Sequence, residues 1–158
     1  MGVEIERKFL VDPAKWKQFN KPEGIAYRQG YLVNEKHKTV RIRIAGDHAF
    51  ITIKGATTGF TRKEYEYDIP LEDAKELLEN FNPAGTSKTR YRIPMAGKVW
   101  EVDEFSDGNA GLIVAEIELK SEGETFEKPG FLLEEVTDDV RYYNSNLATH
   151  PYQSWEVK

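Results

Sequence analysis

The 158-residue sequence contains no cysteine, which excludes disulfides, thiolate metal sites and cysteine nucleophiles. Its three histidines (His37, His48 and His150) are far apart and lack the spacing of zinc ligands. No apolar run approaches the length of a membrane-spanning helix. The N-terminal segment is charged from Glu4 onward and lacks the apolar stretch of a signal peptide, so we expect a cytoplasmic protein with no membrane partner.

The sequence also lacks an excess of positive charge. A formal net charge of −5 argues against broad nucleic-acid binding, which depends on surplus Lys and Arg. A glycine-rich loop of the P-loop or Rossmann type is missing too, so any phosphate must be held by side chains or metal ions. Because no repeat or interdomain linker is present, we expect a single domain over residues 1–158.

Alternation with period two dominates the sequence and is typical of strands with two unlike faces. It predicts about eight strands, at 3–11, 26–33, 39–45, 49–54, 62–69, 87–93, 98–105 and 113–120. Turn residues separate several of them, as in Gly46-Asp47 and Ala96-Gly97. The expected fold is therefore α+β, an eight-stranded antiparallel β-barrel with flanking helices.

Three helices should interrupt the strands. Asp12 is a candidate N-cap for a short helix over 13–19, with proline in its first position. The apolar residues of 71–81 fall on one helical face. A third helix should run through Leu147 and Ala148 from a cap at Asp138 or Asp139, and the packing of the tail after it stays open.

Charged residues occupy alternate positions on most of these strands, and each strand carries mostly one sign. Such faces usually point to solvent. Like charges two residues apart repel, however, and a plain surface would mix the signs along a strand. The alternative is a barrel whose charged face lines the interior and whose apolar face is covered by helices. The charged positions are Glu4, Glu6, Lys8, Arg41, Arg43, Lys54, Glu64, Glu66, Lys88, Arg90, Arg92, Glu101, Asp103, Glu116 and Glu118.

A charged interior of this kind suits the metal complex of a triphosphate. The seven basic and eight acidic residues sum to −1. Two divalent cations would bring this to about +3, close to cancelling a triphosphate of roughly −4 to −5. Arginine grips phosphate oxygens with two N–H groups, and magnesium or manganese prefers carboxylates together with phosphates.

The motif Glu4-x-Glu6-x-Lys8 and the charged motifs that follow it closely resemble the CYTH family, also called triphosphate tunnel metalloenzymes. The resemblance covers essentially the whole chain and implies an eight-stranded tunnel open at both ends, often in a homodimer. Family members include inorganic triphosphatases, thiamine triphosphatases and class IV adenylyl cyclases. The further matching motifs are Gln29-Gly30-Tyr31-Leu32, Arg41-x-Arg43, Thr52-Ile53-Lys54, Glu64-x-Glu66, Lys88-x-Arg90-x-Arg92, Glu101-x-Asp103, Glu116-x-Glu118, Glu135-Val136-Thr137 and Arg141-Tyr142-x-Asn144.

The resemblance also implies roles for the charged residues. Phosphate binding falls to Lys8, Arg41, Arg43, Lys54, Lys88, Arg90 and Arg92. Coordination of Mg²⁺ or Mn²⁺ falls to Glu4, Glu6, Asp103, Glu116 and Glu118. The remaining acids, Glu64, Glu66 and Glu101, are expected to orient basic residues. The candidate catalytic residues are Lys8, Lys54 and Glu4; the two lysines either position phosphate or move protons.

We therefore expect metal-dependent hydrolysis of inorganic triphosphate (tripolyphosphate) to pyrophosphate and phosphate. One metal would bridge substrate phosphates. A second, held by Glu4, Glu116 and Glu118, would orient the attacking water.

Two enzymatic alternatives are thiamine triphosphatase and a class IV-type adenylyl cyclase, which need contacts for an organic group. Trp16, Tyr27 and Trp155 could stack on a base, although a packing role suits each better. A third alternative, a non-catalytic module that binds polyphosphate or nucleotides, is disfavoured by the retained carboxylates.

Overall fold

The computed structural model describes residues 2–158, and its strands form one antiparallel sheet. The strands are β1 Gly2–Val11, β2 Ile25–Glu35, β3 Lys38–Ala45, β4 His48–Gly55, β5 Thr61–Asp68, β6 Gly85–Met95, β7 Lys98–Phe105, β8 Ile113–Glu118 and β9 Leu132–Glu135. The α-helices are α1 Pro13–Gln18, α2 Leu71–Phe81 and α3 Asn144–Leu147. The 3-10 helices are η1 Asp107–Asn109, η2 Val140–Tyr142 and η3 Tyr152–Ser154.

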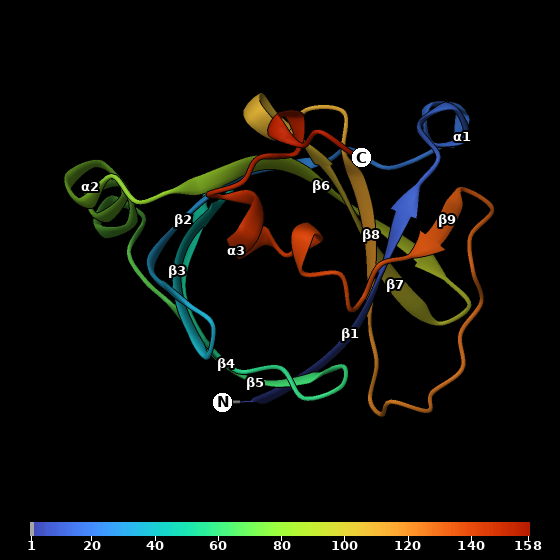
Figure 1. Cartoon of the computed structure of the whole chain (residues 1–158), viewed down its shortest axis with the longest axis horizontal. Helices are drawn as coiled ribbons and strands as arrows, with labels where there is room; N and C mark the ends of the chain where they lie inside the picture. Colours follow the sequence, from blue (N-terminus) through green and yellow to red (C-terminus); the bar gives the residue numbers. More distant parts are fainter. Residues whose placement is uncertain (1) are drawn as a thin grey trace.

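Eight of the strands close into a barrel (Figure 1). Neighbours follow the order β5-β4-β3-β2-β6-β7-β8-β1, and β1 also pairs with β5, which completes the ring. The first part of β1 pairs with β5 and the next part with β8. This confirms the expected eight-stranded antiparallel barrel. The ninth strand, β9, pairs with β1 at Phe9 and Val11 and was not predicted.

Tight turns set the register of two hairpins. Gly46-Asp47 joins β3 to β4, and Ala96-Gly97 joins β6 to β7, as predicted. Gly46, Ala96 and Gly97 have φ values of 59°, 51° and 77°, the left-handed backbone that two-residue hairpin turns use. The alternating charged residues of these strands are thereby aligned side by side.

The helices differ in how well the sequence predicted them. Asp12 caps α1 by accepting hydrogen bonds from the backbone N–H groups at positions 14 and 15, as expected. The amphipathic helix α2 is also confirmed. The predicted C-terminal helix is wrong as a single element, because the extended backbone of Tyr143 (ψ 135°) divides it into η2 and α3. Asp139 nevertheless caps the first piece through the N–H of Arg141.

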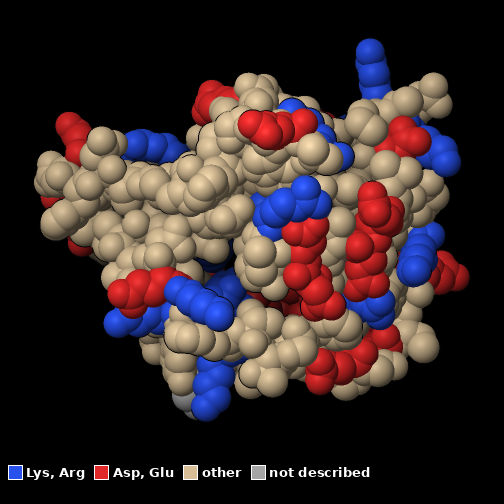
Figure 2. Space-filling view, in the orientation of Figure 1, with Lys and Arg blue, Asp and Glu red and all other residues tan. Residues whose placement is uncertain are grey.

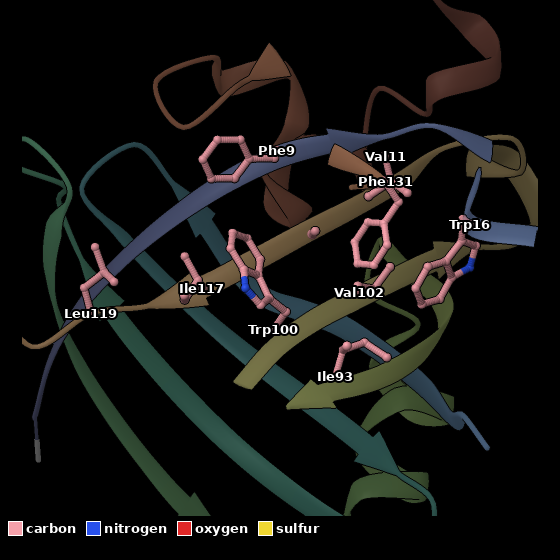
Figure 3. Packing of buried hydrophobic residues seen from close by; sticks show 10 residues of the cluster. Phe9, Val11, Trp16, Ile93, Trp100, Val102, Ile117, Leu119 and Phe131 are labelled. Atoms are coloured by element: carbon pink, nitrogen blue, oxygen red, sulfur yellow. The ribbon is translucent and has the colours of Figure 1, made fainter. Parts of the chain in front are cut away.

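The apolar core lies outside the barrel, between its outer face and the segments that cover it. Trp100 of β7 packs edge-on against Phe9 of β1, with ring centroids 5.7 Å apart (Figure 3). In the same cluster, Trp16 of α1 packs against Phe131, with centroids 5.1 Å apart. On another side, α2 covers Ile42 of β3.

Helices are therefore only part of the expected cover. The chain between β8 and β9, which is not helical, covers β1 and β7 through Phe126 and Phe131. The tail also packs against the body, because Trp155 lies 5.2 Å from Tyr142, measured between ring centroids. Within residues 2–158, no helix has the length and apolar character needed to cross a membrane.

Candidate active site

The predicted charged faces line the inside of the barrel. Eight of the charged residues are at most 9% exposed, which excludes a solvated face for them: Glu4, Lys8, Arg41, Arg43, Lys88, Arg90, Asp103 and Glu116. Burying so many charges is unfavourable unless each is paired or meets a ligand. In the space-filling view of Figure 2, the surface of the molecule has a narrow hollow with basic residues at its edge.

Two cavities meet inside the barrel. The larger has a volume of about 560 Å³ and the smaller about 70 Å³. Both are lined by Glu4, Glu6, Arg41, Lys54 and Asn144, so these five residues surround the region where the cavities meet. Every other predicted site residue except Lys88 and Asp103 lines one cavity: Lys8 the smaller, and Arg43, Arg90, Arg92, Glu116 and Glu118 the larger.

Lys88 and Asp103 instead form a fully buried ion-pair cluster in the wall. Lys88 Nζ lies 2.7 Å from Asp103 Oδ2, and Arg90 donates to both Asp103 oxygens at 2.7 and 2.9 Å. Burial alone would raise the pKa of Asp103, but Arg90 and Lys88 hold it well below its usual range. Burial lowers the pKa of Lys88 to about 7, against the attraction of Asp103. Asp103 thus aligns two cations.

Inside the barrel, Lys54 of β4 and Glu4 of β1 neutralise each other's charge. Lys54 Nζ donates to both Glu4 oxygens, at 2.9 and 3.0 Å, and lies 3.5 Å from Glu64. Burial favours the neutral acid, but Lys54 outweighs it and the pKa of Glu4 is lowered. The pKa of Glu64 is raised by burial and by the charge of Glu4.

Lys8 of β1 also pairs with a carboxylate, which comes from the neighbouring strand β8. It faces Glu116 across the β1–β8 register, with 3.6 Å between Nζ and the carboxylate, and also donates to the carbonyl of Tyr142 at 3.2 Å. Despite burial, Lys8 lowers the pKa of Glu116 to about 2. Both groups are therefore charged at neutral pH.

Each of the three acids expected to orient basic residues contacts at least one of them. Glu64 lies beside Lys54 as described, and Glu66 lies 3.6 Å from Arg41. Glu101 lies 3.3 Å from Arg90 and 3.1 Å from the more exposed Arg92. These contacts are what an orienting role requires.

Arg41 and Arg43 present their guanidinium groups to the cavities from β3. Arg41 Nη2 donates to Thr52 at 3.1 Å, but its Nε is buried with no hydrogen-bond partner among the described residues. Arg43 Nε donates to Gln29 at 2.7 Å. Burial, with Arg41 and Arg90 nearby, lowers the pKa of Arg43 to about 9, which leaves it charged at neutral pH.

The aromatic side chains offer little room for a base. The guanidinium carbons of Arg43 and Arg90 each lie 4.9 Å from the centroid of the Tyr27 ring, so both cations already contact this ring. Trp16 is 2% exposed in the outer core, and Trp155 packs against Tyr142. The packing interpretation of Trp16 and Trp155 is the one that these positions support.

Two of the predicted site acids, Glu6 and Glu118, have no basic partner within 4 Å among residues 2–158. Glu6 faces Glu118 across the β1–β8 register. Burial, then the charges of Glu116 and Glu4, raise the pKa of Glu6 well above its usual range. Burial and the charges of Glu4 and Glu101 likewise raise the pKa of Glu118. These two carboxyl groups of the barrel wall therefore lack a counter-ion within the part of the chain that the structure describes, and a cation beside them would favour their ionised forms.

This wall fits a hard divalent cation that binds together with phosphate. No group of three or more His, Cys, Asp or Glu side chains in the described part of the chain forms a complete metal site. Magnesium, however, usually takes only one or two carboxylates, with substrate phosphates and water completing its shell. The oxygen-only donor set suits such a cation, and so does the lack of a basic partner for Glu6 and Glu118 among the described residues.

Three residues of the site have no role in the sequence analysis. Arg62 lines the smaller cavity and pairs with Glu4 in the register; it stands two positions before Glu64, so the alternation contained the signal. Gln29 and Asn144 link the basic residues to one another. Both belong to matched motifs, but an uncharged amide carries no periodic signal.

Comparison with known proteins gives consistent matches. The family model described as CYTH domain matches residues 2–152. The inorganic triphosphatase of Acetivibrio thermocellus is 46% identical over 157 residues, which is 99% of each chain. The inorganic triphosphatase of Nitrosomonas europaea is 35% identical over 155 residues, covering 92% of this chain and 97% of the relative. A crystal structure of an inorganic triphosphatase is 34% identical, with a TM-score of 0.65 over 94% of this chain and 95% of its own.

Proposed function

Because the chain belongs to the CYTH domain family, we propose that it is a metal-dependent triphosphatase that hydrolyses inorganic triphosphate inside the barrel. The products are pyrophosphate and phosphate: a water oxygen bonds to the terminal phosphorus while the bond to the pyrophosphate leaving group breaks. Two relatives named inorganic triphosphatase, one of them 46% identical over nearly the full length, support this substrate.

The observation that carries the proposal is the buried ring of oriented cations around the cavities. Arg41, Arg43 and Arg90 are each at most 9% exposed and are held by carboxylate or amide partners that fix their direction. The buried Nε of Arg41 lacks an acceptor, which a phosphate oxygen would supply. Side chains fixed in this way stabilise developing phosphate charge without reorganisation.

Glu4, Glu6, Glu116 and Glu118 are the residues we expect to hold magnesium or manganese. When bound, the metal would neutralise phosphate charge and activate water for attack. Glu4 and Lys54 would separate as the substrate binds, Glu4 toward the cation and Lys54 toward phosphate. We expect Lys8, which lies between Glu116 and the Tyr142 carbonyl and lines the smaller cavity, to bind phosphate there.

For two of the residues we propose roles that differ from those expected. Both oxygens of Asp103 accept hydrogen bonds from Arg90 or Lys88, so we propose an orienting role instead of metal coordination. Lys88 lines neither cavity and is 2% exposed, which favours an electrostatic contribution from within the wall.

The test is product release from tripolyphosphate, ATP and thiamine triphosphate, each with magnesium, manganese or EDTA. Release of phosphate and pyrophosphate from tripolyphosphate with metal, and loss of release with EDTA, is the expected result. Preference for an organic substrate, or cyclic AMP from ATP, would replace the substrate but keep the tunnel. Tight binding without turnover would establish the non-catalytic module instead. A homodimer and a cytoplasmic location stay predictions.

A further inference from the structure

Asn144 lies where the C-terminal segment crosses the opening of the barrel. It is the first residue of α3, which Figure 1 shows within the opening beside η2. Its side chain lines both cavities, in the region shared by Glu4, Arg41 and Lys54. Asn144 is the one residue of the shared lining that no barrel strand supplies.

The hydrogen bonds of Asn144 determine which way its amide points. Its Oδ1 accepts from Lys88 Nζ at 2.9 Å and from Gln29 Nε2 at 3.1 Å. An ammonium group has no acceptor, so the oxygen must face Lys88. The carbonyl oxygen of Gln29 accepts from Arg43, which leaves its amide nitrogen for Asn144. The opposite assignment would set donor against donor at both contacts.

The Nδ2 group of Asn144 is therefore directed away from these partners. Both side-chain hydrogen bonds that Asn144 makes within residues 2–158 use Oδ1, and neither uses Nδ2 as a donor. Arg41 supplies a second, independent donor on the same lining, since its Nε is buried without a partner. The buried Nε of Arg41 is unfavourable without an acceptor, and Nδ2 of Asn144 is another donor free to meet a ligand in the same cavity. An anionic acceptor there would satisfy both donors.

Resting on the proposed function, we infer that Asn144 is a substrate-binding residue whose Nδ2 donates a hydrogen bond to a phosphate oxygen of triphosphate. Its Oδ1 at the same time positions Lys88. The C-terminal segment therefore contributes a direct substrate contact in addition to spanning the opening.

Asn144→Asp separates these two roles. Aspartate keeps acceptor oxygens for Lys88 and Gln29 but replaces the donor with a second anionic oxygen. Affinity for the imido analogue of triphosphate with magnesium, measured by calorimetry, should fall roughly ten- to hundredfold. Asn144→Ala removes both roles without adding repulsion and should weaken affinity less. Thermal unfolding should show no loss of stability in Asn144→Asp, because the new charge faces Lys88.

The matched control is Asn146→Asp, which makes the same charge change in the same helix. Asn146 donates to the Arg141 carbonyl and lines neither tunnel cavity, so affinity should stay within about twofold. If Asn144→Asp binds the analogue as tightly as the wild type, the inference is overturned and the proposed function is not. Such a result would mean that Asn144 only positions Lys88, for which an acceptor oxygen is enough. Failure of the wild type to bind the analogue would overturn the proposed function and this inference together.

Discussion

Asp103→Asn should strongly destabilise the barrel. Asp103 is 1% exposed and shares its carboxylate between Lys88 and Arg90, each 2.7 Å away. Asparagine keeps the shape but removes the charge, so the buried Arg90 loses its two charged hydrogen bonds and the pKa of Lys88 falls further, which leaves Lys88 neutral at pH 7. Removing one partner of a buried ion pair costs about 3–5 kcal/mol. Domains have a total free energy of unfolding of about 5–15 kcal/mol, so the loss is a large fraction.

Urea unfolding measures this loss. With a slope of about 2 kcal/mol per molar urea, a loss of about 4 kcal/mol lowers the unfolding midpoint by about 2 M. The control is Glu101→Gln on the same strand. The side chain of Glu101 is 26% exposed; its partners are Arg92, which is 59% exposed, and Arg90, which keeps Asp103 in this variant. Partly exposed pairs contribute about 1 kcal/mol, so the loss should be much smaller.

The pH dependence gives a second test. The pKa of Asp103 is lower in the folded protein than its ordinary value of 3.8, so its ion pairs stabilise the fold fully above that value. This stability is lost as the pH falls below 3.8 toward the folded pKa, and the difference between wild type and Asp103→Asn should shrink with it. A midpoint shift no larger than that of Glu101→Gln would refute the assignment of a desolvated ion-pair cluster.

Three further substitutions test the tunnel. Glu116→Gln should reduce turnover of tripolyphosphate by roughly a hundredfold while circular dichroism stays unchanged; normal turnover would remove Glu116 from the metal site. Arg41→Ala should weaken binding of the imido analogue about tenfold or more in calorimetry, and unchanged affinity would place Arg41 outside the phosphate site. Glu6→Gln should raise the unfolding temperature at neutral pH, because the raised pKa of Glu6 means that its ionised form destabilises the fold. That gain should vanish below about pH 4.5, where the acid is protonated in both states; a gain equal at pH 4 and pH 7.5 would contradict this reasoning.

The barrel was predictable because its strands carry a strong local signal. On β3, Arg41 and Arg43 alternate with apolar residues, and Ile42 between them is fully buried outside the barrel. The charged residues face the inside of the barrel and the apolar residues the outside, which is the reverse of the usual arrangement. The period of two is nevertheless that of any strand. Two-residue turns at Gly46-Asp47 and Ala96-Gly97 then align neighbouring strands without long-range information.

The pairing within the site was less predictable, because it depends on strands distant in sequence. Lys8 meets Glu116 only after β1 and β8 pair. The strand β9, whose sequence is Leu-Leu-Glu-Glu, has no alternation to reveal it. The break at Tyr143 depends on tertiary contacts as well, since the carbonyl of Tyr142 accepts from Lys8. Asn144 enters the site only because this break places it there.

The ladder that closes the ring has a consequence for synthesis on the ribosome. Within residues 2–158, four residue pairs join β1 to β5, beginning at Gly2 and Glu64, and β1 otherwise pairs with β8 and β9. β1 therefore leaves the exit tunnel well before β8 and β9, the partners of most of its length. Such nonlocal pairing slows folding, and β1 has an unpaired edge until β8 has been synthesised. The alternating Glu4, Glu6 and Lys8 would keep that edge hydrated and discourage association with other nascent chains during the delay.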